Sequence, residues 1–259
     1  MILRRLAQNL KEQGWTAITI EFVLLVLGVF LGIQVANWNT AVADRRVAET
    51  YLAAIADDVR SDISELAHAR DKALVRIGAS AYLLREAGSV DIAPVIELTH
   101  RPDAGVFAGL ERTDIPEADA PPPEQRGRLW SLSVDLYMYD ANRSAYDALV
   151  GSGQIDLIGD PHVVRALREY YYLVDALTAT QLRTVAPMRQ KFVDVGIDRG
   201  YSLMGTADEK ALVERIRADP ALAAAIATSR EVAGMHLVLI TALDRKAHEL
   251  VRLLEGDRP

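Results

Sequence analysis

The sequence predicts an all-α protein: one N-terminal transmembrane helix continues into an elongated bundle of about four helices, with a Pro-rich connecting segment. Three observations support this fold class. One long apolar stretch lies near the N-terminus. In every long segment after it, apolar residues recur at steps of three and four, as on one face of a helix. Two Asp-Pro pairs later in the chain are typical helix starts.

The transmembrane helix is predicted over residues 16–38. Its apolar run contains one ionisable residue, Glu21, close to the N-terminal edge. About 20 apolar residues at roughly 1.5 Å per residue cross a hydrocarbon layer about 30 Å thick. Trp15 and Trp38 flank the run, and amphipathic indoles prefer the membrane–water interface. We therefore expect a membrane-anchored protein with the lipid bilayer as its first partner.

A cleaved signal peptide is the alternative to a retained anchor, because residues 41–43 are Ala-Val-Ala. Signal peptides usually have about 7–15 apolar residues and a total length of about 15–30. Cleavage here would remove 43 residues, and the apolar run is longer than that pattern. A retained anchor is the interpretation that we adopt.

Residues 1–15 form a short amphipathic segment, in which apolar residues at helical spacing alternate with basic ones. The segment either lies on an anionic membrane surface or simply begins the anchor helix. Three basic residues precede the span and two follow it closely: Arg4, Arg5 and Lys11, then Arg45 and Arg46. This balance favours a cytoplasmic N-terminus in a bacterial inner membrane, with the bulk of the chain outside the cytoplasm.

Small residues form a stripe along the span. Gly28 and Gly32 make a GxxxG pair, and Ala36 extends it by one turn. Such spacing lets two helix backbones approach closely, and Glu21 falls within roughly 20° of Gly28 on the helical wheel. The stripe predicts a parallel homodimer, or contact with another membrane protein. The alternative is a chance GxxxG, since Gly is common in membrane spans.

Charge and cysteine content exclude several classes of function. The formal net charge is −7, and the excess of acidic residues lies after residue 43. An acidic soluble part argues against nucleic acid as a partner, since such binding needs a basic face. The chain has no cysteine, which excludes disulfides, thiolate metal sites and cysteine nucleophiles.

The first half of the soluble part is predicted as one helix and one connection. Residues 39–87 form a membrane-proximal helix that leaves the span and can bend near residues 37–39. Residues 88–128 are a Pro/Gly-rich connection with a short strand or helical turn at 95–98. The prolines of this connection favour the role of a stiff, extended spacer.

Residues 129–256 supply the other helices of the bundle, which pack with residues 39–87 as one domain. The first is predicted over 129–149, where Gly151 and Gly153 stop it. The next starts at Asp160-Pro161, and Pro187 should kink or end it. A capping-box pattern at residues 206–209 opens a short helix to about residue 218, and Asp219-Pro220 opens the last helix. The apolar run 235–243 is too short for a second span, so we expect a core helix there.

Candidate sites for chemistry are few. Tyr170, Tyr171 and Tyr172 are consecutive, so one ring should face the core and the others a groove or rim. The cluster either binds a ligand or simply packs. Asp57, Asp58 and Asp62 could hold a cation, but they lie on the polar face of an amphipathic helix, where solvated charge is the usual explanation. No catalytic, phosphate-loop or histidine-pair motif is present, so we expect no cofactor, no metal and no catalytic residue.

Two stretches together give a resemblance. The first is IEFVLLVLGVFLGIQVANWN (20–39) followed by YLAAIADDVRSDISEL (51–66), and the second is YDALVGSGQIDLIGDPHVVRALREYYY (146–172). They resemble a family of uncharacterised bacterial single-pass membrane proteins. The matching positions are Glu21, Asn37, Trp38 and Asn39 in the first, and Tyr146, Leu149, Ser152, Gly153, Ile158, Tyr170 and Tyr171 in the second. The resemblance implies a membrane location and a helical soluble domain, and no activity.

Three hypotheses of function follow. The leading one is a non-enzymatic cell-envelope interaction protein or sensory-like scaffold, in which the bundle and the span are coupled through Gly28 and Gly32. The second is a small-ligand binding module with a pocket between helices near residues 170–172. The third is an anchored hydrolase, which would need a convergent acid, base or nucleophile cluster that the sequence does not display.

Overall fold

The computed structural model describes residues 2–89 and 118–256, and all regular structure in these two ranges is helical, as predicted. The strand or turn predicted at 95–98 lies outside them. The elements in chain order are α1 (Ile2–Glu86), η3 (Pro123–Arg128), α2 (Leu129–Ser133), α3 (Ser144–Gly151), η4 (Gln154–Leu157), α4 (Pro161–Thr180), η5 (Gln181–Val185), α5 (Ala186–Ile197), α6 (Glu209–Ala218) and α7 (Pro220–Leu254).

Helix α1 is one uninterrupted element of 85 residues. At 1.5 Å per residue its length is about 130 Å. It joins the predicted N-terminal segment, the apolar stretch and the membrane-proximal helix, and it continues through residues 37–39 without a break. It ends at Glu86, and Gly88 in the following turn has a φ of 81°, which lets the Ser89 N–H bond back to the Leu84 carbonyl at 2.9 Å.

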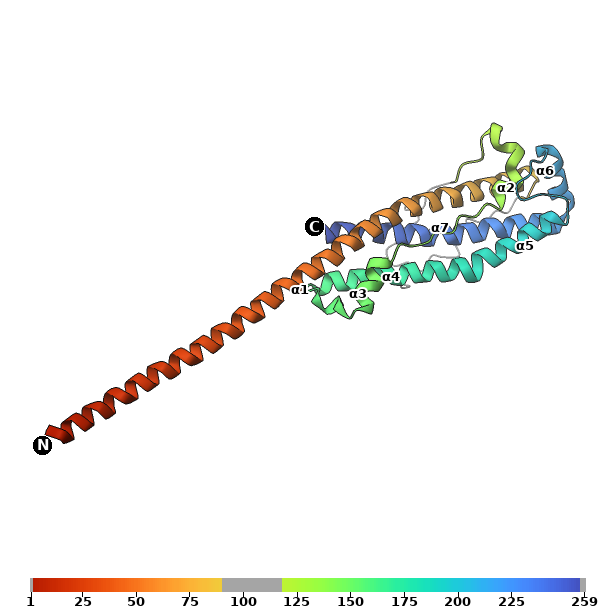
Figure 1. Ribbon diagram of the computed structural model, residues 1–259. Coiled ribbons are helices and arrows are strands. Elements are labelled where there is room, and N and C mark those ends of the chain that lie inside the picture. Colours follow the sequence, from red (N-terminus) through yellow and green to blue (C-terminus); the bar gives the residue numbers. More distant parts are fainter. Residues whose placement is uncertain (1, 90–117, 257–259) are drawn as a thin grey trace.

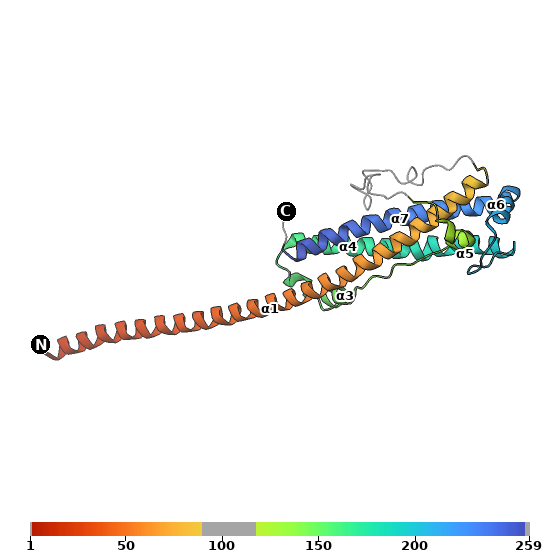
Figure 2. The same ribbon diagram turned by 90° about the horizontal axis from the view of Figure 1, so that it is seen from above.

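The C-terminal part of α1, the helix α7 and the successive helices α4 and α5 pack together (Figures 1 and 2). We call this part of the molecule, residues 48–86 and 118–256, the helical body. Among the residues of α1 whose burial the structure describes, Ala48 is the first that is buried. The part of α1 before it projects from the body as a free rod (Figure 1). Helix α3 and the C-terminal end of α7 lie at the end of the body nearest the free rod, and α6 lies at the opposite end.

Aspartate caps begin three of these helices. The side chains of Asp160, Asp208 and Asp219 each accept a hydrogen bond from a backbone N–H two or three residues further on. The two Asp-Pro starts are confirmed. The short helix to residue 218 is also confirmed, but its cap is Asp208 rather than the first residue of the expected capping box.

The single helix predicted over 129–149 is wrong. Helix α2 stops at Ser133, α3 begins at Ser144, and residues 134–143 between them, which we call the strap, contain no helix. Backbone groups of the strap form hydrogen bonds with side chains of other elements. The amide of the Gln181 side chain bonds both the N–H and the carbonyl of Tyr139, at 2.9 and 2.8 Å. These tertiary bonds replace those of a helix, which propensity alone would have favoured.

Pro187 does not end its helix. The chain passes from α4 through the π-helical segment η5 and continues as α5, with the proline in the first turn of α5. Helix α7 contains the run 235–243, and 61% of its most apolar window is buried inside the body. This agrees with the prediction of a core helix rather than a second span.

Candidate functional site

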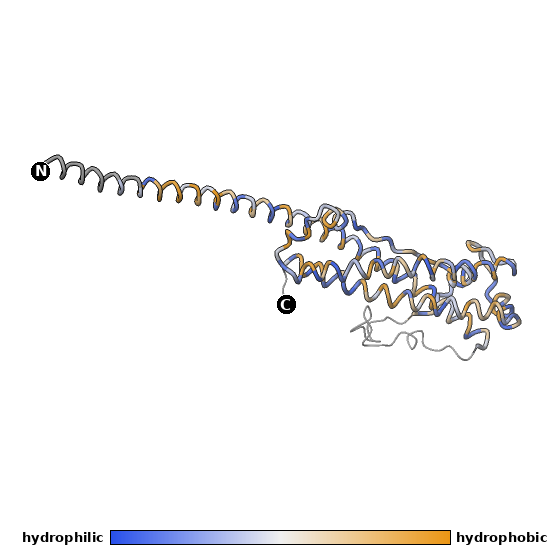
Figure 3. Tube along the Cα trace, turned by 90° about the horizontal axis from the view of Figure 1, so that it is seen from below, coloured by the Kyte–Doolittle hydropathy of each residue, from blue (hydrophilic) through white to orange (hydrophobic). Residues whose placement is uncertain are grey.

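The free rod exposes a long apolar surface. Its most apolar window has a mean hydropathy of 2.2 and none of it is buried (Figure 3). By length and composition the rod can cross a membrane. Glu21, Gly28, Gly32 and Ala36 are all exposed on it, and a Cβ atom added at either glycine would meet nothing within 4 Å. The backbone around the small-residue stripe is therefore open to another helix.

The predicted interface residues flank this surface. Trp15 and Trp38 are 68% and 70% exposed. They lie 23 residues apart on one straight helix, which places them about 35 Å apart along its axis. This spacing suits two indoles at opposite faces of a hydrocarbon layer about 30 Å thick. Asn37 and Asn39 are also exposed, next to Trp38.

The three consecutive tyrosines on α4 have different environments. Tyr170 and Tyr171 are buried in the core, whereas Tyr172 is 64% exposed. The structure thus buries two of these rings where the sequence favoured one. Tyr171 stacks on Tyr146 with ring centroids 3.8 Å apart. Its hydroxyl is buried without a hydrogen-bond partner among the described residues.

Asp62 is the centre of a buried hydrogen-bond network. It is 1% exposed, whereas a solvated polar face was one expectation for this residue. Its Oδ2 accepts from the Tyr170 hydroxyl at 2.7 Å, and its Oδ1 accepts from the Asn142 N–H at 2.9 Å. Burial raises the pKa of Asp62, and these two hydrogen bonds oppose the rise. Asp57, by contrast, lies at the surface and pairs with Arg60. The three aspartates do not converge on one point.

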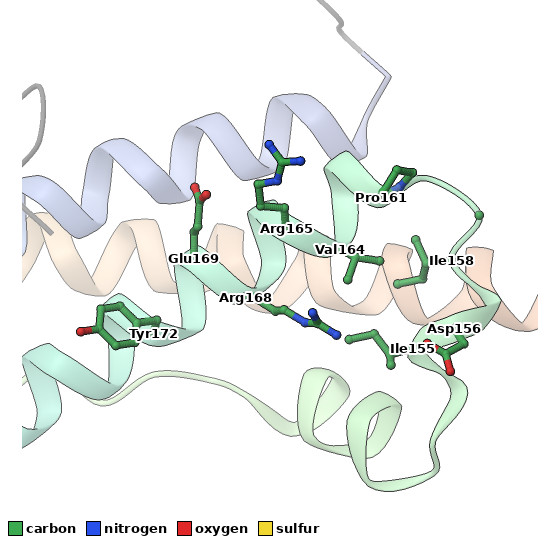
Figure 4. A pocket seen from close by; sticks show the side chains of 10 residues that line it. Ile155, Asp156, Ile158, Pro161, Val164, Arg165, Arg168, Glu169 and Tyr172 are labelled. Carbon is green, nitrogen blue, oxygen red and sulfur yellow. The ribbon is translucent and has the colours of Figure 1, made fainter. Parts of the chain in front are cut away.

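Beside the buried tyrosines, the outer face of α4 lines an open groove of about 650 Å³ (Figure 4). Its walls come from η4, from the turn after η4 and from the first turns of α4. The lining is mostly apolar and includes Ile155, Ile158 and Val164. Tyr172 forms one end of the groove, and Arg168 points toward the η4 side (Figure 4).

The groove has charges of both signs at its rim. Arg165 and Arg168 lie one turn apart on α4, and Asp156 lies across from Arg168. Glu169 lies 3.9 Å from Lys246 of α7, so this carboxylate is partly neutralised. The groove combines an apolar wall, an exposed phenol ring and two guanidinium groups, which together suit an anionic ligand with an apolar part.

A second buried polar cluster lies in the middle of the body, where α1, η5, α7 and the strap meet. We call it the buried joint: Arg76, Gln181, Ser229 and His236. The Arg76 Nε donates to Ser229 Oγ at 3.0 Å, and His236 Nε2 lies 2.9 Å from Gln181 Oε1. The Gln181 oxygen is an acceptor, so His236 donates from Nε2. Burial and the charge of Arg76 lower the pKa of His236 to about 4.

Sequence reasoning did not find the buried joint. Arg76 stands three residues from both Ala73 and Ala79, which are buried, so its place on the core-facing stripe of α1 was available as a signal. For Gln181 and His236 the sequence held no comparable signal. Their role depends on the π-helical turn and on the strap, neither of which was predicted.

Comparison with known proteins adds no assignment: no protein-family model, curated protein or solved structure matches this chain. Within residues 2–89 and 118–256, no group of three or more His, Asp or Glu side chains is arranged to hold a metal ion. The free rod, the groove and the buried joint are therefore the features of the molecule that indicate a function.

Proposed function

We propose that this protein is a membrane-anchored, non-enzymatic scaffold of the bacterial cell envelope. The observation that supports this most directly is the continuity of α1. The most apolar window of its N-terminal part is entirely exposed, and its C-terminal part belongs to the core of the helical body, with no break in the helix between them. A rigid helix of this kind transmits rotation or tilt of the span directly into the body.

Pairing of the span is the second part of the proposal. Gly28, Gly32 and Ala36 allow close backbone approach of a second helix, and Glu21 lies on the same side. The partner is a second copy of this chain or another membrane protein. Because α1 continues into the body, parallel pairing of two spans would bring two helical bodies side by side.

The resemblance of the two stretches to a family of uncharacterised bacterial single-pass membrane proteins supports this proposal. We further propose an elongated bundle of about four helices as the soluble domain, outside the cytoplasm, with a cytoplasmic N-terminus in the inner membrane. Helix α1 ends at Glu86, so the end of the body at which α1 stops is then the one farthest from the membrane.

Cysteine labelling of intact bacterial cells tests the anchor and its orientation. The chain has no cysteine, so single cysteines can be placed at will. Met204 is 80% exposed near α6, whereas Ala242 is 1% exposed in α7. With Met204→Cys, we expect a membrane-impermeant maleimide to label a full-length, membrane-bound protein in intact cells. The matched control Ala242→Cys should react only after denaturation.

Two results would contradict the proposal. Labelling of Met204→Cys only after lysis would reverse the orientation. A labelled product that is shortened and soluble would show cleavage near residues 41–43, and the span could then have no role in the mature protein.

The groove supports a second candidate function, binding of a small anionic ligand with an apolar part. The specific observation is that Tyr172 and Arg168, both exposed, share a cavity of about 650 Å³ with an apolar wall. A fluorescent fatty acid is a suitable first probe. We expect its affinity to fall about tenfold in Arg168→Ala, and to be unchanged in the surface control Arg183→Ala, which lies outside the groove. Equal binding by both variants would remove the groove from consideration.

A further inference from the structure

Arg76 is a buried charge whose hydrogen bonds are incomplete. The residue is 1% exposed, and arginine stays protonated in proteins. Its Nε donates to Ser229, but its Nη2 is buried with no hydrogen-bond partner among the residues that the structure describes. A buried charge normally requires a counter-charge and satisfied donors, because water no longer solvates it.

The groups that face Arg76 do not supply the counter-charge. Lys72 of α1 and Arg189 of α5 are cationic neighbours, and His236 of α7 is neutral. The strap contributes one carboxylate, Asp135, which makes its ion pair with Lys72 at 3.2 Å. Burial and the charge of Arg189 lower the pKa of Arg76 to about 10, and the charge of Asp135 raises it. The positive charge at this point of the body therefore exceeds the negative charge.

A small cavity adjoins the guanidinium. Its volume is about 10 Å³, and its lining includes Lys72, Arg76, Asp135, Tyr137 and His236. This space holds one water-sized group and excludes phosphate or an organic acid. The side chains of Lys72 and Asp135 are 40% and 36% exposed, so the cavity lies one side chain below the surface and an ion can reach it.

We propose that this cavity binds one small inorganic anion, with chloride as the physiological candidate. The anion would accept a hydrogen bond from Nη2 of Arg76. The positive charge of Lys72, at the mouth of the cavity, would attract it as well. Water could satisfy the same donor but not the charge. The site goes beyond the scaffold function. It joins α1, the strap and α7 at one point, so occupancy would stiffen the middle of the helical body.

Thermal unfolding of the full-length protein in detergent tests the proposal. Tm is compared in sodium chloride and sodium gluconate at equal ionic strength, since gluconate is too large for the cavity. We expect Tm to be higher in chloride by roughly 2–4 °C, with a saturating dependence on chloride concentration. Chlorine-35 NMR gives a direct readout, as exchange with a bound site broadens the chloride line.

Matched variants locate the site. Lys72→Met removes one cationic neighbour at a half-exposed position, and we expect it to reduce both the Tm difference and the line broadening. Lys246→Met is the control, since Lys246 pairs with Glu249 on the surface and is absent from the cavity, and it should behave as the native chain. Arg76→Lys should abolish both effects. Equal Tm values of the native protein in the two salts, or an equal loss in Lys246→Met, would overturn the proposal.

Discussion

Tyr170 and Asp62 lie 108 residues apart in the sequence, and the Tyr170 hydroxyl donates to the Asp62 carboxylate at 2.7 Å in the core. The bond joins α4 to α1. The same carboxylate holds the strap through the N–H of Asn142. One buried acid thus fixes three segments of the body relative to one another, and its hydrogen bonds stabilise an aspartate in a core position where an apolar residue would otherwise pack.

Tyr170→Phe should destabilise the protein by about 1–3 kcal/mol. The substitution removes one hydrogen-bond donor to the carboxylate of Asp62, which is 1% exposed, and the buried negative charge loses part of its stabilisation. Chemical denaturation of the full-length protein in detergent, followed by circular dichroism, measures the change in the free energy of unfolding.

The neighbouring tyrosines are matched controls for this change. The Tyr171 hydroxyl is buried without a partner in the described structure, so Tyr171→Phe should be neutral or slightly stabilising. Tyr172 is exposed, so Tyr172→Phe should have no effect on stability. Equal effects of all three substitutions would contradict the buried network.

Gln181→Leu should cost about 2–4 kcal/mol. The Gln181 amide pairs with both backbone groups of Tyr139, and loss of the amide leaves a buried N–H and carbonyl unpaired. The strap should then loosen, which proteolysis between α2 and α3 would detect as a new cleavage. Gln190→Leu on the exposed side of α5 is the control and should leave the strap protected.

Helix starts and stops could be predicted from the sequence because they depend on local chemistry. Asp160 and Asp219 each cap a helix through their own side chains, and Gly153 adopts a φ of 72° directly after the end of α3. None of these features requires knowledge of a distant residue. The long helix from the span into the body was also predictable, since no proline separates the span from the apolar periodicity of residues 39–87.

The strap and the buried joint could not be predicted because they depend on distant partners. Residues 134–143 have no strong helix breaker, and their departure from helix is stabilised by Gln181 and Asp62. The sequence placed Asp62 on a solvated face, since a helical pattern cannot show that the strap covers that face. The tyrosine run was recognised, but which rings are buried follows from packing.

Acid should destabilise the protein through His236. Its folded pKa is about 4, below the ordinary value of 6.5, because burial and Arg76 disfavour the charged form. The unfolded chain therefore takes up this proton at a higher pH than the folded chain. The free energy of unfolding therefore falls as the pH drops from about 6.5 to about 4. The full difference between the two pKa values of His236 corresponds to about 3 kcal/mol.

Comparison with His236→Gln isolates this contribution. The raised pKa of Asp62 acts in the opposite direction, since the folded chain takes up that proton more readily. The difference in unfolding free energy between the native protein and His236→Gln should therefore change over pH 6.5 to 4 and stay constant above pH 7. A pH-independent difference would show that His236 is not buried as a neutral ring.

Gly196→Ala should destabilise the protein by about 1–3 kcal/mol, although alanine is normally the better helix former. A Cβ atom at Gly196 would lie 1.8 Å from the ring of Trp130, which is 2% exposed and cannot move aside easily. Gly151→Ala in α3 is the control, because a Cβ there meets nothing within 4 Å. It should be neutral or slightly stabilising. Thermal unfolding of both variants measures the contrast in sign.

Pairing of the span predicts a disulfide between two copies at Asn39. This position is eleven residues after Gly28, so it returns to within roughly 20° of the same helix face. In a parallel pair, Asn39→Cys should form a disulfide-linked dimer under mild oxidation in membranes. Adding Gly28→Ile and Gly32→Ile blocks close approach of the two helices, and we expect an association constant about tenfold lower, which corresponds to about 1.4 kcal/mol.

The control variant is Val26→Phe, which adds bulk on the opposite face of the helix and should leave the crosslink unchanged. Equal loss in both would indicate non-specific contact between spans, and a crosslink that is insensitive to either would place the contact elsewhere on α1.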